Sequence, residues 1–171
     1  MEFHMELKLK KPIHTVKRTT IRKLYDEKLD DGRSVIFDIC EIFHETDEID
    51  FIAYGFGSND WCVDCRYDLP GVIEELPDIL GKLDAGDYDF VLDFYEQGTE
   101  REIQFVDWGD HVVLICKSRT NWKPVPDRIK MEKDRVDHIF RNLYRRFYEY
   151  GEGLCPDLIA QPLREWFRKC K

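Results

Sequence analysis

DYDFVLDFYEQGTEREIQFVDWGD, residues 87–110, is the stretch that decides the fold we expect for this chain. Its first half alternates between side chains that suit a protein core and side chains that suit water, which predicts a half-buried β-strand. The core face would hold Tyr88, Phe90, Leu92 and Phe94. Gly98-Thr99 has the glycine-first composition of a two-residue turn, so we expect a second strand to return beside the first.

That turn sets the register of the predicted hairpin. It pairs Phe94 with Ile103 and Leu92 with Phe105, so both strands bury the same face. The opposite face would gather the carboxylates Asp89, Asp93 and Glu102. Their like charges would repel one another in the free protein. Such a face is either only solvated or serves to bind a partner of opposite charge.

Acidic residues are concentrated in the middle of the chain. The whole sequence has 26 Lys and Arg and 35 Asp and Glu, with a net charge of -9. Residues 30–110 hold 4 of the basic and 23 of the acidic residues, a balance of -19, whereas the two flanking segments are net positive. If this segment folds, its negative charge attracts basic partners and repels nucleic acid, so we expect no nucleic-acid binding.

Length and composition are those of one folded unit. With 171 residues, 43% of them hydrophobic, we treat residues 1–171 as a single domain. Residues 1–4 are interpreted as a cloning remnant, and a natural start at Met1 is the alternative. No apolar run approaches the roughly 18 residues of a membrane span, and the N-terminus has no apolar secretion signal. We therefore expect a cytoplasmic protein without a membrane partner.

Six cysteines in a chain without a secretion signal favour thiols over disulfides. Cys62 and Cys65 form a C-x-x-C, the spacing that begins many zinc sites and redox motifs. No second ligand pair follows, and residues 61–69 are interpreted as a strand, in which positions three apart point to opposite faces. Its core face would hold Trp61, Val63, Cys65 and Tyr67. We expect no metal and no cofactor, and any role of the cysteine pair stays open.

The remaining middle segments complete the expected secondary structure. Residues 34–43 predict a strand from their Ile, Val and Phe content, residues 44–50 predict a loop, and residues 111–119 predict a central strand. Asp68-Leu-Pro-Gly has the N-cap and early proline of a helix start. Pro77 should kink this helix or split it.

Two helices are expected at the C-terminus. Residues 127–150 carry apolar side chains at helical spacing with Gly151 after the end, and residues 156–169 form a second helix. The predicted class is α+β: an antiparallel sheet of about five to six strands, with one helical stretch inserted and two C-terminal helices packed on one face.

Few residues have the arrangement of an active site. The sequence contains no phosphate-binding glycine loop and no nucleophile elbow, and its histidines do not fall at metal-ligand spacing. We therefore expect no enzymatic activity. The alternative is a metal-dependent hydrolase using Asp93 and Glu102, because clustered carboxylates can hold a divalent cation.

One combination of motifs resembles a known family. FIAYGFGSNDWCVDCRYDL, the helix segment ELPDIL, LDFYEQGTEREIQF and the strand end CKSRTNW are together similar to bacterial immunity proteins of contact-dependent growth inhibition and related polymorphic toxin systems. The similarity covers residues 51–122, and DFYEQGTER, residues 93–101, is its most specific element. It implies a small, cytoplasmic, non-enzymatic protein that binds one cognate toxin domain and blocks it.

An acidic surface suits such a task, because many of these toxins are nucleases with basic substrate-binding surfaces. Charge pairs and aromatic anchors across an interface both contribute to binding. The candidate partner-binding residues are Asp47, Glu48, Asp50, Trp61, Asp87, Asp89, Tyr95, Glu96, Glu100, Glu102 and Trp108. An acidic adaptor unrelated to toxins is a further alternative. The sequence fixes neither the toxin nor the oligomeric state.

The first testable prediction is that folding needs neither metal nor disulfide, since a core of this size should suffice. Melting temperatures would be compared with and without a chelator and a reductant. A fall of more than about ten degrees in either condition would contradict the prediction, because at this size it corresponds to several kcal/mol.

Overall fold

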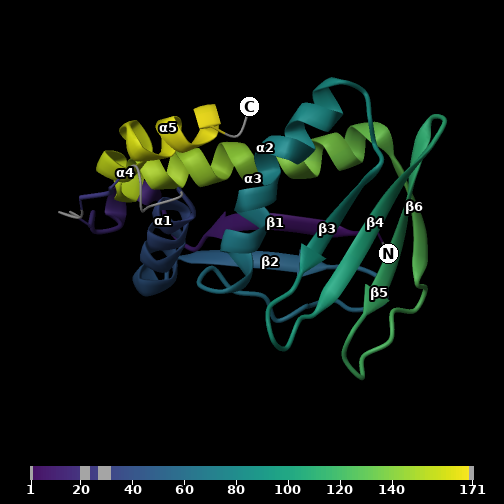
Figure 1. Cartoon of the computed structure of the whole chain (residues 1–171). Coiled ribbons are helices and arrows are strands. Elements are labelled where there is room, and N and C mark those ends of the chain that lie inside the picture. Colours follow the sequence, from purple (N-terminus) through teal and green to yellow (C-terminus); the bar gives the residue numbers. More distant parts are fainter. Residues whose placement is uncertain (1, 20–23, 27–31, 170–171) are drawn as a thin grey trace.

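Two antiparallel sheets are present in the computed structural model, which describes residues 2–19, 24–26 and 32–169 (Figure 1). The smaller sheet pairs β1 (His4–Leu9) with β2 (Ile49–Tyr54). Phe3, just before β1, is 1% exposed and packs against Phe56 and Trp61. Part of the segment interpreted as a cloning remnant therefore belongs to the core.

The larger sheet is an antiparallel meander. Its strands lie in the order β3 (Phe90–Phe94), β4 (Arg101–Trp108), β5 (His111–Ser118) and β6 (Arg128–Glu132). The predicted α+β class is confirmed, although the strands divide between two sheets. The predicted interior position of β5 is also correct, since it pairs with β4 on one side and β6 on the other.

The register of the β3–β4 hairpin differs from the prediction. Phe94 pairs with Arg101 and Leu92 with Ile103, a shift of two residues. The chain uses six residues, 95–100, to turn, and Gly98-Thr99 lies inside this longer loop. Side chains alternate with a period of two, so a shift of two keeps every predicted face. The aromatic side is buried as expected, and Arg101 joins it.

Helix α1 (Arg33–Thr46) replaces the strand predicted for residues 34–43, and it continues into the predicted loop. The abundance of β-branched and aromatic side chains favoured a strand. Their spacing is helical, because the buried set is Val35, Ile36, Ile39, Cys40, Ile42 and Phe43. Burial of this stripe against the rest of the core outweighs the local strand preference.

Helix α2 (Asp68–Asp84) begins where predicted and contains Pro77 without being divided. Asp68 does not cap it: this carboxylate is the first helical residue and accepts a hydrogen bond from the Asp64 backbone N–H at 3.0 Å. Residues 61–67 form no strand. Tyr67, predicted to face the core, is 49% exposed, whereas Asp68, predicted to face water, is 7% exposed.

The C-terminal helical region also differs in its boundaries. Residues 128–132 form β6 instead of a first helical turn, and α3 (Lys133–Leu154) runs through Gly151. Gly151 is needed there for packing, because an added Cβ would lie 2.5 Å from Ile159 Cδ1. The second predicted helix is broken into α4 (Pro156–Ala160) and α5 (Pro162–Lys169). A short 3₁₀ turn, η1 (Ile13–Thr15), follows β1.

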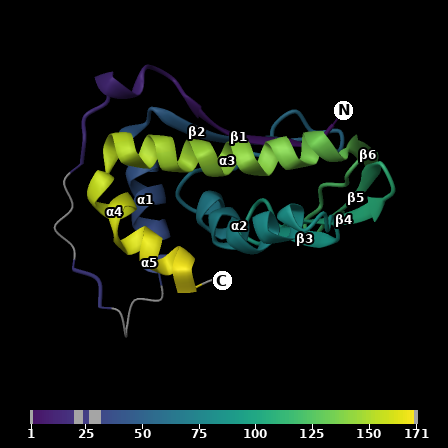
Figure 2. The same cartoon turned by 90° about the horizontal axis from the view of Figure 1, so that it is seen from above.

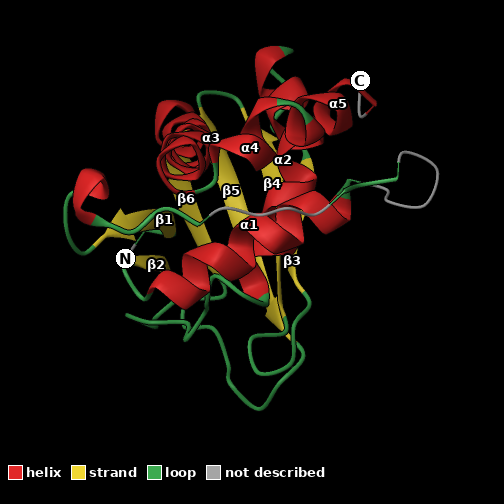
Figure 3. Ribbon diagram, turned by 90° about the vertical axis from the view of Figure 1, so that its left-hand side faces the viewer, coloured by secondary structure: helices red, strands yellow, loops and turns green. Residues whose placement is uncertain are grey.

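Helices and the β1–β2 ribbon cover one face of the larger sheet (Figures 2 and 3). On that face Phe105 stacks on Phe90 at 4.4 Å between ring centroids, and both contact Phe140 of α3 edge-on. None of the described helices lies on the opposite face. No helix among these residues is long and apolar enough to cross a lipid bilayer.

Trp61 connects the two sheets. Its ring contacts Phe3 at 5.5 Å on the ribbon side and Phe94 at 5.3 Å on the larger sheet. Its indole N–H donates to the Gly55 carbonyl at 3.2 Å. Trp61 is therefore a core residue, which corrects its assignment as a surface anchor.

This position generates a prediction about stability. Trp61→Ala should lower the free energy of unfolding by about 3–5 kcal/mol, because it opens a cavity where the two sheets meet. Trp108→Ala is the matched control, since Trp108 is 66% exposed and exposed substitutions change stability by only about 0.5 kcal/mol. Urea titrations of both variants measure this, and equal losses would contradict the assignment of Trp61 to the core.

Candidate protein-binding surface

The predicted partner-binding residues fall into separate places. Tyr95, Glu96 and Glu100 lie in the turn between β3 and β4, with Glu102 just beyond it. The far end of the same hairpin holds Asp87, Asp89 and Trp108. At roughly 3.3 Å per residue, the length of β4 puts about 20 Å between these two groups. The two groups therefore lie at opposite ends of the hairpin.

A third group, at the junction of α1 and β2, is largely neutralised. Asp47 and Asp50 accept the Lys10 ammonium at 3.1 and 3.2 Å, and Glu48 pairs with Lys11. These lysines follow β1, which is the strand next to β2. The pairing removes most of the negative charge that the sequence had placed in this segment.

One exposed stripe of α1 forms ion pairs with α2 and with the loop that precedes it. Arg33 Nε lies 3.7 Å from Glu74 Oε2, and Arg66 Nη2 lies 3.1 Å from Glu41 Oε1. Phe37 lies on this stripe midway between Arg33 and Glu41, because residues four apart share a helix face. Its ring is 42% exposed. An apolar side chain is thus presented between two charged contacts.

Tyr95 extends this region from the hairpin turn. Its ring rests on Gly71 of α2, where an added Cβ would lie 2.9 Å from Tyr95 Cε1. Tyr67 lies one helical turn before Gly71, and the Arg66 guanidinium is 5.4 Å from its ring centroid. Tyr95 and Tyr67 are 51% and 49% exposed. Together with Phe37 they make three accessible rings on neighbouring elements.

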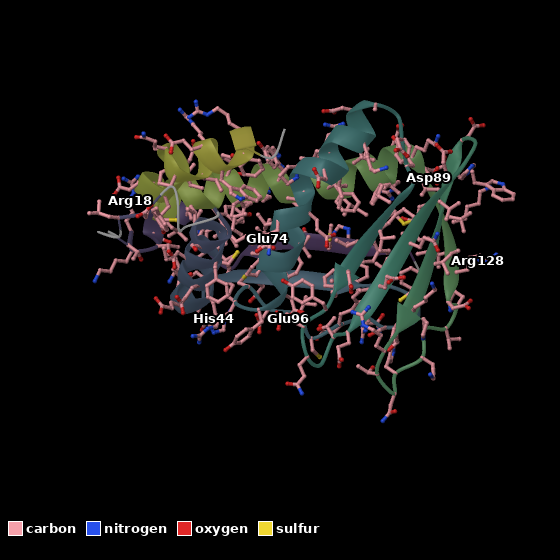
Figure 4. The ribbon with its side chains drawn as sticks, in the orientation of Figure 1. Arg18, His44, Glu74, Asp89, Glu96 and Arg128 are labelled. Atoms are coloured by element: carbon pink, nitrogen blue, oxygen red, sulfur yellow. The ribbon has the colours of Figure 1, made fainter. Side chains whose placement is uncertain are left out.

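Several carboxylates lie near these rings. Glu74 lies on α2 and Glu96 in the hairpin turn, both on the side shown in Figure 4. We call the whole patch the acidic–aromatic surface, and define it by Phe37, Glu41, Tyr67, Glu74, Glu75, Asp78, Tyr95 and Glu96. Of the predicted residues it contains Tyr95 and Glu96. The sequence does not predict the other six. Phe37 and Glu41 lie on an exposed helical stripe that the predicted strand at residues 34–43 lacks. Tyr67 is predicted to face the core, and carboxylates on an outward helix face such as that of α2 are ordinarily only solvated.

Within this surface the carboxyl group of Glu75 has a raised pKa. Burial raises its pKa to about 7, and the negative charge of Asp93 adds to the rise, while the Asp93 backbone N–H that bonds this carboxyl opposes it. Glu74 and Asp78 contribute further repulsion. The acidic–aromatic surface therefore gains a negative charge as the pH rises through neutrality.

Asp93 and Glu102, the carboxylates of the hydrolase alternative, are direct cross-strand partners. Each already meets a cation: Arg119 Nη2 lies 2.5 Å from Asp93, and Lys117 Nζ lies 3.6 Å from Glu102. Across the described ranges, no three His, Cys, Asp or Glu side chains are grouped to hold a metal ion. The geometry therefore favours a structural ion-pair network at this position.

The C-x-x-C cysteines do not share an environment. Cys65 is buried and its thiol bonds the Ile49 carbonyl at 3.5 Å, whereas Cys62 is exposed and has a positive φ of 54°. Burial raises the pKa of Cys65 to about 12, which disfavours the thiolate needed for metal binding or redox exchange. Both cysteines are free thiols.

The chain matches no protein-family model, and no curated protein and no solved structure is significantly similar to it. Its function is therefore argued from the surface itself. The feature that distinguishes this surface is the combination of accessible aromatic rings with three carboxylates, Glu75, Asp78 and Glu96, that form no ion pair within the described ranges.

The raised pKa of Glu75 predicts a pH-dependent stability. Its folded pKa of about 7 lies above the ordinary value of 4.5, so the folded state holds the proton more tightly and stability falls as the pH rises between these values. Glu75→Gln should remove this loss. The variant should melt at a higher temperature than the wild type at pH 8 and show no such gain at pH 4.

The matched control is Glu152→Gln, because Glu152 is an exposed residue of α3. The difference in melting temperature between this variant and the wild type should be the same at pH 4 and pH 8. A Glu75→Gln gain of equal size at both pH values would show that ionisation of Glu75 is not its cause.

Proposed function

We propose that this chain is an immunity protein that binds and neutralises a cognate toxin domain in the cytoplasm, and that the acidic–aromatic surface meets the toxin. The observation that carries the proposal is the exposure of Phe37, Tyr67 and Tyr95. Glu74, Glu75 and Glu96 lie near the Tyr95 ring. Aromatic side chains anchor protein interfaces because they bury a large apolar area. The resemblance of residues 51–122 to immunity proteins supports the same assignment.

Charge supports a basic partner. Glu75, Asp78 and Glu96 form no ion pair with any residue whose position is described, so their negative charge is available to a partner. Such charges steer the approach of a basic surface and repel nucleic acid. A toxin domain that itself binds nucleic acid through a basic surface, as a nuclease does, would be complementary.

Two alternatives use neighbouring residues. An acidic adaptor would use the same acidic–aromatic surface for a basic protein that is not a toxin. A metal-dependent hydrolase would use Asp93 and Glu102. These carboxylates already form ion pairs, Asp93 with Arg119 and Glu102 with Lys117. Calorimetric titration with magnesium, manganese and calcium separates this last case, since specific binding that disappears in Asp93→Asn would favour the hydrolase.

The decisive experiment begins with the gene encoded immediately upstream of this one. If that gene encodes a large secreted or cell-surface toxin, its C-terminal domain is produced in cells with and without this chain. Protection of growth together with co-purification of the two proteins would support the proposal. Growth arrest despite abundant folded chain would refute it, and co-purification with a non-toxic basic protein would favour the adaptor.

Substitutions in the acidic–aromatic surface should separate two kinds of contribution. Glu96→Gln combined with Asp78→Asn should slow association with the toxin domain and flatten its salt dependence, because peripheral charges act during approach. Tyr95→Ala should speed dissociation and weaken binding by about 2 kcal/mol or more, as expected for an aromatic anchor. Surface plasmon resonance at two salt concentrations measures both effects.

Matched controls are Asp47→Asn for the carboxylates and Trp108→Ala for the tyrosine, because both lie outside the acidic–aromatic surface. Neither should change the rates. Loss of binding in Asp47→Asn with no effect of the surface variants would instead place the interface at the junction of α1 and β2.

A further inference from the structure

The open face of the larger sheet carries an apolar stripe that its fold leaves uncovered. Val106 and Val113 are direct cross-strand partners in β4 and β5, and Val91 and Ile115 flank them on the two diagonals. Trp108 lies two residues along β4 from Val106, on the same side. Val91 and Trp108 are 47% and 66% exposed. The solvated face of an antiparallel sheet is ordinarily polar, so this stripe calls for a partner.

Charge on this open face is divided between its two halves. The β3–β4 half carries Asp89, Asp93 and Glu102. Within the same copy Asp93 pairs with Arg119 and Glu102 with Lys117, whereas Asp89 forms no ion pair with any described residue. The β5–β6 half carries Lys117, Arg128 and Lys130, with Glu132 as its only carboxylate. Asp89 comes directly before the edge strand β3, and Arg128 begins the opposite edge strand β6; both are labelled in Figure 4. Arg128 and Lys130 make no ion pair within the described part of the chain.

An apolar stripe between an acidic half and a basic half is complementary to itself. We infer that the open face of the larger sheet binds the same face of a second copy of this chain. A two-fold axis parallel to the strands, between β4 and β5, would place β3 of one copy over β6 of the other. Like-for-like contact is what a two-fold interface requires.

This arrangement pairs the charged halves. Because the axis exchanges β4 with β5 and β3 with β6, Asp89 of one copy faces Lys130 of the other. The Glu102–Lys117 pair of each copy meets the same pair of the other copy in reverse order, so the four charges alternate in sign. At the centre, Val106 of one copy packs against Val113 of the other. Two sheets stacked face to face in this way bury side chains from both inner faces, as in a β-sandwich.

The area of the open face sets the expected affinity of the dimer. Four strands about 4.8 Å apart and up to eight residues long give an area of a few hundred Å² per copy, which is less than the roughly 800 Å² per partner of a standard stable interface. The dimer should therefore be weak and in exchange with the monomer. It would leave the acidic–aromatic surface free, because α1 and α2 lie on the other side of the sheet (Figures 2 and 3).

Sedimentation velocity tests the inference on the full chain, at protein concentrations from about 10 µM to about 1 mM, the range in which weak complexes form. The wild type should shift towards a dimer as its concentration rises. Val113→Lys should remain monomeric throughout, because it puts a charge at the centre of the stripe. Val125→Lys is the matched control: Val125 is 72% exposed in a loop outside this face, and its variant should dimerise like the wild type.

Charge reversal tests the two-fold arrangement itself. A copy with Lys117→Glu and Lys130→Glu, and a copy with Asp89→Lys and Glu102→Lys, should each be monomeric alone because like charges would face each other. An equal mixture should recover the dimer. A wild type that stays monomeric at every concentration, a Val113→Lys variant that still dimerises, or a mixture that does not recover would each overturn the inference.

The toxin supplies an independent control. Val113→Lys should bind the toxin domain with the wild-type rates, and a loss of that binding would assign the open face to the toxin and overturn the inference. Failure of the proposed immunity function would leave the sedimentation result unchanged, so the two outcomes are distinguishable.

Discussion

Arg101 is the constraint on which the rest of the structure depends. Its side chain is 7% exposed, and its guanidinium carbon lies 4.5 Å from the ring centroid of Trp61 and 3.8 Å from that of Trp122. Two of its nitrogens, Nε and Nη1, have no hydrogen-bond partner among the residues that the structure describes. A cation buried in this way is costly unless something compensates it, and two aromatic faces provide that compensation. Trp61 follows β2 and Trp122 follows β5, so this single side chain ties the loops of both sheets together.

Fixing Trp61 in this position also decides which face of the larger sheet is buried. The β1–β2 ribbon reaches Trp61 through Phe3 and Phe56, and the ribbon therefore lies on the same face as α2 and α3. One face of the sheet thus receives the ribbon and the helices together. The other keeps its apolar stripe exposed, which is why the same packing that builds the core also leaves a surface for a second copy.

The acidic character of the middle segment is reshaped by folding. The net positive flanks return to it: Lys10 and Lys11 neutralise the α1–β2 junction, Arg119 pairs with Asp93, and Lys133 pairs with Asp107 at 2.8 Å. Beside the three exposed aromatic rings, Glu75, Asp78 and Glu96 form no ion pair with any described residue. The negative charge of the acidic–aromatic surface therefore comes from carboxylates that neither the flanks nor Arg33 and Arg66 neutralise.

The sequence by itself determined the α+β class, the two faces of the β3–β4 hairpin, the interior position of β5 and the start of α2, because alternation, helical spacing and turn residues act over a few neighbouring positions. Only the tertiary structure decided that residues 34–43 are helical, that residues 128–132 pair as β6, and that the hairpin turns over six residues. Each of these depends on burial against segments distant in the chain, which local patterns do not encode. The same distance explains the surface: Phe37, Tyr67 and Tyr95 are separated in sequence, and only the packing of α1, α2 and the hairpin turn makes them neighbours.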